Sequence, residues 1–400
     1  MSRRGLAGVV VVLLGGASQV GWAAPELPLG PTALDERRSS AQLTPAVRWT
    51  RISREGGPWR VNVLSVEPEG RVAVTTGGDA VGVRARPSTL ARRMGGVAAI
   101  NGGYFAADGS PAGVLASAGL LLSEPVGGRT ALALDGRERR LTALRFAGAV
   151  TLDGETRLLD GVNRRLGMVP ACGGRGGDRP TERPNAATTC TDPSELVLFA
   201  PQWGSRAPAA DQHALVRAGA IASLGRRAIP DDGFVLGATG DAARFLDEGG
   251  ATGATVVTDL GLRSPRGWLR IEDFAGIVGG GPRLLTNGRV RVRAAAEGFA
   301  PLSAPWFYGS FVAGRHPRTL AGVRSDGTLL LVTVDGRRPG WSAGMTLFEA
   351  ARLMRSLGAS DALNLDGGGS TTMTVRGEVV NRPSDRVGER PVSNALYVLP

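Results

Sequence analysis

The chain has 400 residues, of which 42% are hydrophobic and 21% charged, so it can form a packed core, and a wholly disordered chain is excluded. Glycine is about twice as frequent as usual, at 60 residues, and follows no triplet period, which excludes collagen. Because an interior glycine costs a helix roughly 0.5–1 kcal/mol, this composition disfavours a helix bundle and favours short strands joined by tight turns.

The formal net charge is +11, and the 47 lysine-or-arginine positions are all arginine. An arginine-rich surface for nucleic acid or another polyanion is one interpretation. A compositional preference for arginine over lysine is the other. The second is favoured, because the arginines are spread along the chain in nothing longer than short pairs such as Arg92-Arg93. There is neither zinc-finger spacing nor an aromatic RNA-binding signature, so no nucleic-acid partner is predicted.

The first residues have the pattern of a secretory signal peptide. A basic start and an apolar run from Gly5 to Gly16 precede the small residues Gly21 and Ala23, which suit a cleavage site after Ala23. A membrane anchor is the alternative, but a span needs about 20 apolar residues and this run is shorter. We therefore predict a signal peptide at 1–23 and a secreted protein, periplasmic or extracellular, with no stable membrane insertion after cleavage.

Residues 24–46 are polar and contain proline, and we interpret them as a linker before a single domain at 47–400. Within that domain, short apolar runs bounded by turn residues predict strands, and a short helix is expected from Pro87 to Met94. The predicted strands are 60–66, 71–74, 97–100, 196–199, 254–258, 276–278, 329–334, 362–365 and 373–375.

One further helix has clear boundaries in the sequence. Thr346 and Glu349 have the spacing of a capping box, in which the threonine hydroxyl caps the first turn and the glutamate reaches back. An apolar stripe with a period near 3.6 follows, and Gly358 is expected to end the helix. Short strands with few helices predict an α+β fold with mixed or antiparallel β-sheets.

The two cysteines, Cys172 and Cys190, flank a loop rich in glycine, arginine, proline and threonine. In an exported protein they are expected to form one disulfide, which stabilises such a loop by roughly 3 kcal/mol. A metal site would need more cysteine or histidine at short spacing, and the chain has only two histidines, His213 and His316. No cofactor is predicted to be required, although acidic loops of exported proteins can hold a structural Ca²⁺.

The sharpest functional signal follows the predicted strand at 362–365, where Asp366 precedes Gly367-Gly368-Gly369 and Ser370. The glycines permit positive φ and a close approach to a ligand, and their N–H groups can form an anion-binding nest. A nucleotide phosphate loop would end in Gly-Lys-Ser/Thr and continue as a helix, whereas a strand follows here. Taken alone, a glycine turn without a ligand is an equal alternative.

A second carboxylate, Asp335, follows the strand at 329–334, and His316 and Arg318 precede it. Two carboxylates can divide acid and base or nucleophile roles at a glycosidic bond, arginine binds phosphate through two N–H groups, and histidine titrates near neutral pH. Each also has an ordinary alternative: Asp335 in an Asp-Gly turn, Arg318 as a surface ion, and His316 as a loop residue with its hydrogen bonds satisfied.

Taken together, four segments of the chain resemble the phosphodiester glycosidase family, over about residues 47–400. The resemblance implies a secreted hydrolase that cleaves the glycosidic bond of a sugar-1-phosphodiester, such as an N-acetylglucosamine-1-phosphodiester, and releases sugar and a phosphomonoester. Bacterial members are described as exopolysaccharide-related, so the family does not specify the substrate. The segments are 99–105 (AINGGYF), 316–319 (HPRT), 335–337 (DGR) and 362–370 (ALNLDGGGS), and 279–282 (GGGP) also fits.

The resemblance implies roles for the residues in these motifs. Asp366 and Asp335 are candidates for the carboxylate roles, and His316 for proton transfer to the leaving phosphate. Arg318 and Arg337 are candidates for binding the phosphate. The remaining candidates for the substrate site are Asn101, Gly102, Asn364, Gly367, Gly368, Gly369, Ser370 and Arg390.

The same residues allow two alternatives to an enzyme. A non-catalytic protein of the same fold would bind envelope carbohydrate or exopolysaccharide without turnover. A polyanion-binding protein would use the net charge of +11 and bind with a steep salt dependence. The carboxylates and arginines of the motifs favour the enzyme, with a glycan or sugar phosphate as its partner.

Overall fold

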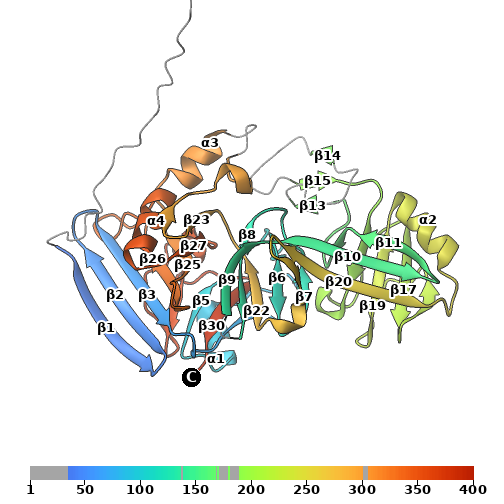
Figure 1. The fold of residues 1–400 in the computed structure, drawn as a ribbon, viewed down its shortest axis with the longest axis horizontal. Coiled ribbons are helices and arrows are strands. Elements are labelled where there is room, and N and C mark those ends of the chain that lie inside the picture. Colours follow the sequence, from blue (N-terminus) through green and yellow to red (C-terminus); the bar gives the residue numbers. More distant parts are fainter. Residues whose placement is uncertain (1–34, 137, 168, 171–178, 181–188, 301–304) are drawn as a thin grey trace, which may run out of the picture.

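The computed structural model describes residues 35–136, 138–167, 169–170, 179–180, 189–300 and 305–400. Figure 1 shows one domain drawn out into two lobes. The larger lobe contains both ends of the described chain, and the smaller one is built from residues of the middle of the chain. The long strands β10 (Arg145–Leu152) and β20 (Val256–Ser264) connect the two lobes as a paired ribbon.

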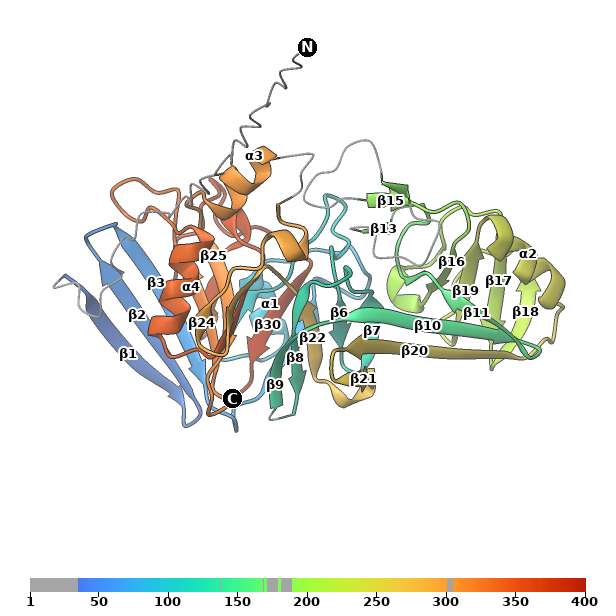
Figure 2. The same cartoon turned by 45° about the horizontal axis from the view of Figure 1, so that its top comes forward.

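The larger lobe is organised around an eight-stranded antiparallel sheet with α4 (Leu347–Ser356) packed on one face (Figure 2). Alternate residues of its strands point to opposite faces: Leu330 and Val332 pack with α4, whereas Leu329 and Leu331 pack toward a second sheet. The strand order is β1 (Arg37–Thr44), β2 (Val47–Arg54), β3 (Trp59–Val66), β26 (Leu329–Val334), β25 (Arg318–Val323), β27 (Asp361–Asn364), β23 (Arg283–Thr286) and β24 (Arg289–Val290).

Two five-stranded sheets complete the larger lobe. The first, with α1 (Pro87–Arg93) beside it, has the order β29 (Glu378–Val379), β28 (Met373–Val375), β5 (Ala98–Asn101), β30 (Asn394–Val398) and β4 (Val72–Thr76). The second has the order β7 (Leu120–Ser123), β6 (Leu115–Ser117), β22 (Gly276–Gly279), β8 (Thr130–Asp135) and β9 (Glu138–Ala143).

The smaller lobe has an apolar core between two sheets and α2 (Gly240–Gly249), and this core continues onto one face of the β7–β6–β22–β8–β9 sheet. Its pair β12–β16 is parallel, and its other strand pairs are antiparallel, so the molecule has mixed sheets and the predicted α+β class is confirmed. The first sheet adds β11 (Glu155–Leu159) and β21 (Gly267–Leu269) to β10 and β20. The second contains β12 (Gly161–Val162), β16 (Leu196–Phe199), β19 (Gly233–Ala238), β17 (Gln212–Arg217) and β18 (Ala220–Leu224).

Short elements connect these layers. A short sheet at the edge of the smaller lobe has the order β13 (Val169–Pro170), β15 (Thr189–Thr191) and β14 (Arg179–Pro180). In the larger lobe α3 (Pro305–Phe307) continues into one π-helical turn at Tyr308–Val312. Among the described residues, no helix has both the length and the apolar character needed to cross a membrane.

The capping box predicted for α4 is confirmed. Thr346 Oγ1 accepts from Glu349 N at 3.1 Å, and Glu349 Oε2 accepts from Thr346 N at 2.9 Å. Gly358, just beyond the helix, has φ +86, a left-handed conformation that ends the helix without a Cβ penalty. The short amphipathic pattern therefore located this helix correctly.

The structure corrects part of the predicted linker and leaves the predicted signal peptide and disulfide untested. Residues 37–44, inside the predicted linker, form β1, which pairs with β2; the linker interpretation is wrong there, because backbone pairing to a neighbouring strand holds a largely exposed, polar segment. The predicted signal peptide at 1–23 lies outside the described residues. Cys172 lies outside them too, so its disulfide with Cys190 stays a prediction.

Candidate active site

The candidate site lies where three strands of the central sheet share an edge. In the antiparallel register, Arg318 at the start of β25 faces Val334 at the end of β26, and Leu320 faces Asn364 at the end of β27. The segments that continue from these ends therefore meet at one edge. Asp335 and Asp366, which follow β26 and β27 directly, are placed there by the topology.

Asn101, at the end of β5, links this edge to the neighbouring sheet. Its buried side chain donates from Nδ2 to the backbone oxygen of Asp366 at 2.7 Å. Its Oδ1 accepts from Thr319 Oγ1 at 2.8 Å and from Thr372 N at 3.1 Å. Asn101 is thus a positioning residue for Asp366. The two threonines were not singled out in the sequence, because only their distant partner reveals their function.

Gly102 is required by a close approach of two chain segments. A Cβ on Gly102 would lie 2.0 Å from Asn394 Oδ1, and that oxygen accepts from Gly103 N at 2.7 Å. The carbonyl of Gly102 accepts from Asp366 N at 3.1 Å. The glycine therefore supports the loop through its backbone, and Asn394 is a second positioning residue that sequence patterns did not identify.

The Asp366 carboxyl is the acid in this region whose environment is most unusual. Burial raises its pKa to about 6, although a hydrogen bond from the Ser370 side chain and the positive charge of Arg390 both favour the ionised form. The next residues, Gly368–Ser370, form a single 3-10 turn. A carboxyl with a pKa near 6 is well placed to change protonation at near-neutral pH.

Two guanidinium groups lie against the glycine turn. A Cβ on Gly368, whose φ is +59, would lie 3.3 Å from both Nη atoms of Arg337. A Cβ on Gly369 would lie 2.1 Å from Arg390 Nη2 and 2.2 Å from Asp385 Oδ1. The absence of side chains at these glycines is what lets both arginines approach the backbone beside Asp366.

Arg390 already has a carboxylate partner. Its Nε and Nη2 donate to the two oxygens of Asp385 at 2.8 and 3.1 Å, and its Nη1 lies 3.5 Å from Ser370 Oγ. The pair is partly exposed, so a ligand phosphate could compete for the same guanidinium. Asp385 therefore orients Arg390 toward the loop, and it also competes with a ligand phosphate for the guanidinium.

His316 is held between Arg337 and a backbone carbonyl. Its Nε2 lies 2.7 Å from Ser310 O, an acceptor, so Nε2 carries the hydrogen, and Nδ1 accepts from Arg337 Nη2 at 3.1 Å. Burial, together with the charges of Arg318 and Arg337, lowers the pKa of His316. The neutral ring acts here as an acceptor that orients Arg337. Its role in proton transfer stays a prediction and requires an exchange of hydrogen-bond partners.

Arg318 is buried, so the alternative of a surface ion is wrong. It donates from Nε to Met345 O at 2.8 Å and from Nη2 to Phe311 O at 2.7 Å and Gly314 O at 2.9 Å. Desolvation lowers its pKa to about 10. Within the described residues its Nη1 makes no hydrogen bond. Arg318 mainly ties the segment at 311–314 to the sheet edge, and only Nη1 remains for a phosphate.

Asp335 is also buried and strongly bonded. Its carboxylate accepts from Trp341 Nε1 at 2.9 Å, from Asn381 Nδ2 at 3.2 Å, and from Arg382 N at 3.1 Å. Burial raises its pKa, against these hydrogen bonds. The geometry makes Asp335 an anchor for the loop at 381–382 rather than a carboxyl with free lone pairs.

Asn364 belongs to a small polar cluster under the loop. Its Nδ2 donates to Tyr104 Oη and to Leu365 O, each at 2.6 Å, and Tyr104 Oη donates to Gly281 O at 2.7 Å. Within the described residues, the buried Oδ1 of Asn364 has no hydrogen-bond partner. Burial and the charge of Asp366 raise the pKa of Tyr104. Tyr104 lay within a recognised motif, but no role was assigned to it.

The structure thus brings most of the predicted residues together around Asp366. Arg390 and the glycine turn act on the carboxyl, and Arg337 lies against Gly368 of that turn. His316 contacts Arg337, and Asn381 connects Asp335 to the backbone oxygen of Thr371, just after the turn. Among the described residues, no cluster of three or more His, Cys, Asp or Glu side chains is arranged to hold a metal ion.

Comparison with known proteins shows which family part of the chain resembles. Residues 216–399, a little under half of the chain, match the family described as phosphodiester glycosidase. This range contains every recognised motif except that around Asn101.

Two curated proteins align over parts of the chain. The mouse N-acetylglucosamine-1-phosphodiester alpha-N-acetylglucosaminidase is 29% identical over 116 residues, which is 29% of this chain and 22% of that protein. The SPbeta prophage-derived uncharacterized protein YomE of Bacillus subtilis is 44% identical over 84 residues, which is 21% of this chain and 13% of that protein. The chain therefore spans less than a quarter of the length of these relatives.

Solved structures match over almost the whole chain. A protein from Burkholderia pseudomallei, described as exported on prediction, has a TM-score of 0.79 and 25% identity, covering 94% of this chain and 99% of that one. A hypothetical protein from Synechocystis has a TM-score of 0.70 and 24% identity, covering 90% of this chain and 63% of that one. These similarities establish that the two-lobed fold recurs in bacterial proteins.

Proposed function

We propose that the protein is a secreted hydrolase that cleaves the glycosidic bond of a sugar-1-phosphodiester, of the N-acetylglucosamine-1-phosphodiester kind, and releases free sugar and a phosphomonoester. The observation that carries the proposal is the Asp366 carboxyl, with a pKa raised to about 6, next to a glycine turn on which two guanidinium groups pack. A carboxylate beside phosphate-binding cations matches the two halves of such a substrate.

The chemistry divides naturally between these groups. Arg337 and Arg390 would bind the phosphate oxygens, which places the sugar C1 near Asp366. The C1–O bond breaks with its electron pair going to the phosphate oxygen, and water supplies the hydroxyl on C1 and the proton for the phosphate. Asp366 in its ionised form would stabilise or attack the positively charged sugar carbon.

The leaving group explains why a dedicated acid is less necessary here than in ordinary glycosidases. A phosphomonoester leaves as a stable anion, and the arginines neutralise the charge that develops on it. This fits the observed state of His316, whose Nε2 hydrogen points to Ser310 O, and of Asp335, which is fully engaged. Asp335 and Arg318 would then support the site rather than contact the substrate.

Secretion is supported by two separate observations. Residues 1–23 have the basic start, apolar run and small residues of a signal peptide. The Burkholderia pseudomallei protein, which matches almost the whole chain, is itself described as exported on prediction. Export would bring the site to glycans of the cell envelope or its surroundings.

A second candidate is a non-catalytic protein of the same fold that binds exopolysaccharide. The engagement of Arg390 by Asp385 favours it, because that ion pair must loosen before Arg390 can bind a phosphate. Turnover separates the two candidates.

The test is to incubate the mature protein with a panel of sugar-1-phosphodiesters and to detect free sugar and phosphomonoester by mass spectrometry. Asp366→Asn is expected to lower kcat by roughly 10³-fold or more, as for loss of one essential catalytic group. The matched control is Asp241→Asn, in an exposed carboxyl on α2, which should keep the full rate.

Two outcomes would count against the proposal. If the wild-type protein binds glycans but forms no product across the panel, the binding protein is the better description. If Asp366→Asn turns over at the wild-type rate while its melting curve shows a folded protein, the enzyme function stands but the site assignment is wrong.

A further inference from the structure

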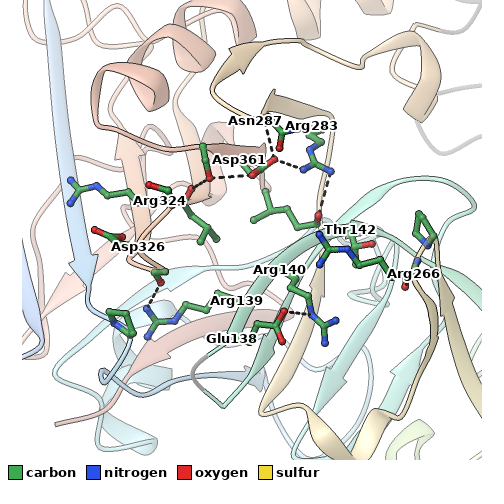
Figure 3. A pocket seen from close by; sticks show the side chains of 18 of the residues that line it. Glu138, Arg139, Arg140, Thr142, Arg266, Arg283, Asn287, Arg324, Asp326 and Asp361 are labelled. Atoms are coloured by element: carbon green, nitrogen blue, oxygen red, sulfur yellow. Dashed lines mark hydrogen bonds and ion pairs between the residues drawn. The ribbon is translucent and has the colours of Figure 1, made fainter.

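A pocket lies at the opposite end of the strands that carry the candidate active site (Figure 3). Its volume is about 680 Å³. β25 starts at Arg318 on the active-site edge and ends at Val323 in the pocket, whereas β27 starts at Asp361 in the pocket and ends at Asn364 on the active-site edge. The pocket is therefore separated from Asp366 by the length of the sheet strands.

The pocket is walled by four segments and is rich in charge. Its walls are β9, the β20–β21 turn, the β23–β24 turn and the β25–β26 turn, with the start of β27 between them. Positive charges exceed negative ones. The charged lining residues are Arg139, Arg140, Arg266, Arg283 and Arg324 against Glu138, Asp326 and Asp361.

Two of these arginines build the walls. Arg139 is buried and donates to the backbone oxygens of Val66 at 2.6 Å, Glu67 at 2.9 Å and Gly327 at 3.1 Å. Arg283 forms an ion pair with Asp361 and donates from Nε to Leu285 O at 3.0 Å and from Nη1 to Leu141 O at 3.3 Å. Their N–H groups are largely committed, so they contribute rigidity and positive potential.

The other arginines keep N–H groups for a ligand. Arg266 is exposed and, in the part of the chain that the structure describes, forms no ion pair; Figure 3 shows it extending toward Thr142 and Arg283. Arg140 is paired with two carboxylates, through Nε with Glu138 Oε1 and through Nη2 with Asp135 Oδ2, each at 3.4 Å. Among the described residues its Nη1 makes no hydrogen bond, and a ligand anion would compete with these long, partly exposed pairs for the guanidinium. Arg324 donates from Nε to Leu357 O at 3.0 Å, which leaves its two Nη groups unbonded among the described residues.

The rest of the lining mixes polar side chains with the aliphatic residues Pro68, Leu141, Pro265, Leu269 and Val323. Hydroxyl and amide groups come from Thr142, Ser264, Ser325, Ser360 and Asn287, and no aromatic side chain lines the pocket. The charged and hydroxyl groups of this lining disfavour a wholly apolar ligand. It offers hydrogen-bond partners to a ligand that carries hydroxyl groups as well as a negative charge.

We propose that this pocket binds a small carbohydrate that carries one anionic group, a phosphate or a carboxylate, with Arg266 and Arg140 contacting the anion. A guanidinium fork matches both kinds of anion, and the pocket volume is in the range of small-molecule sites. The site is distinct from the one at Asp366, and the proposal holds whether or not turnover occurs there.

The test is isothermal titration calorimetry of the full mature chain with three sugars. Galacturonate supplies a carboxylate, glucose 6-phosphate supplies a phosphate, and glucose is the neutral reference. We expect at least one anionic sugar to bind tenfold or more tightly than glucose, and the stronger of the two identifies the anion. Arg266→Ala should weaken that binding at least tenfold, whereas Arg226→Ala, which removes an exposed arginine outside the pocket, should change it less than twofold.

Further arms decide where and what the pocket binds. Arg390→Met, at the other end of the sheet, should leave the affinity within twofold; a loss there instead of at Arg266 would place the ligand in the candidate active site and overturn the proposal. Equal weakening by Arg266→Ala and Arg226→Ala would reduce the effect to general charge and overturn it too. Inorganic phosphate binding as tightly as glucose 6-phosphate would overturn the carbohydrate assignment, as would no saturable binding of either anionic sugar.

Discussion

Charged side chains lie beside the strand ends at both ends of the central sheet, but they differ in burial and in the partners that they bond. At the active-site end the charged side chains of Arg318 and Asp335 are buried and bonded to backbone and neutral groups. At the pocket end, Arg283 pairs with Asp361 and Arg140 with Glu138, and these side chains remain in contact with solvent. Arg318 and Asp335 are held rigidly because they are desolvated, although the Arg390–Asp385 pair near them is partly exposed. The ion pairs at the pocket end can exchange partners with solvent, although Arg139 there is buried.

This difference separates stability from ligand binding. At the active-site end, removing a buried hydrogen bond strongly lowers the free energy of unfolding, because water cannot reach the polar group that has lost its partner. At the pocket end, solvent replaces a lost partner and screens the charges. Equivalent substitutions should therefore lower the free energy of unfolding more at the active-site end than at the pocket end.

The largest expected effect is on Arg318. Arg318→Met removes the donor for three carbonyl groups, those of Met345, Phe311 and Gly314, and should lower the free energy of unfolding by about 3–5 kcal/mol. Arg324→Met, at the pocket end of the same strand, removes a single bond to Leu357 O and should lower it by about 1 kcal/mol or less. Urea unfolding followed by circular dichroism measures both.

If both variants lost similar amounts of unfolding free energy, the proposed difference between the two ends would be wrong. A small loss for Arg318→Met, together with a strongly raised KM for the substrate, would show that Arg318 is used for phosphate binding, as the sequence predicted, more than for holding the loop. A fixed m-value in the urea titrations is the check that both variants unfold in the same way.

Local signals in the sequence predicted much of the fold. The capping box located α4, and the apolar runs at 196–199 and 329–334 coincide with β16 and β26. What local signals missed depends on distant partners. β1 is a polar segment that becomes a strand through β2, and the separation into two lobes depends on how the β10–β20 ribbon packs.

The candidate site shows the same limit more sharply. Motifs found Asp366, its glycines and the arginines, because polar residues and glycine after an apolar strand are a local pattern. Thr319, Thr372 and Asn394 were assigned no role, although Thr319 lies in a recognised motif, because they act on residues more than two hundred positions away in the chain. The burial of Arg318 and Asp335, which turns candidate ligand-binding groups into supports, likewise exists only after folding.

The stability contributed by two carboxyl groups, one at each end, should change with pH in opposite directions. Burial raises the pKa of Asp366 to about 6, so the folded state binds its proton more tightly than the unfolded state. This carboxyl therefore reduces stability as pH rises from about 4 to 6, by about 2–3 kcal/mol in all. Relative to wild type, Asp366→Asn should gain stability over this interval.

Asp326, in the β25–β26 turn, provides the opposite case. The backbone N–H of Thr328 donates to its carboxylate at 2.9 Å and lowers its pKa. Its ionised form therefore stabilises the fold, and that contribution is lost as pH falls through the lowered pKa. Asp326→Asn should lose stability relative to wild type as pH rises from 3 to 5. Thermal melts of both variants and of the wild type from pH 3 to 6 measure the two slopes, and slopes of the same sign would contradict the assignment.

The smallest expected effect compares two glycines with positive φ, one at each end. Gly344, φ +83, lies so close to His316 that a Cβ would come within 2.6 Å of its backbone carbonyl, whereas Gly327, φ +88, faces only Pro68 Cγ at 3.3 Å. Both Gly→Ala variants pay for the left-handed conformation, about 1 kcal/mol. Gly344→Ala should lose about 1–2 kcal/mol more, because backbone atoms at the closely packed end cannot move aside. Gly344→Ala should also lower kcat and alter its pH profile, since the shifted His316 is a hydrogen-bond partner of Arg337. Gly327→Ala should leave both kcat and its pH profile unchanged. Equal losses of stability would show that the active-site end yields as readily as the open end, and that its rigidity does not come from close packing.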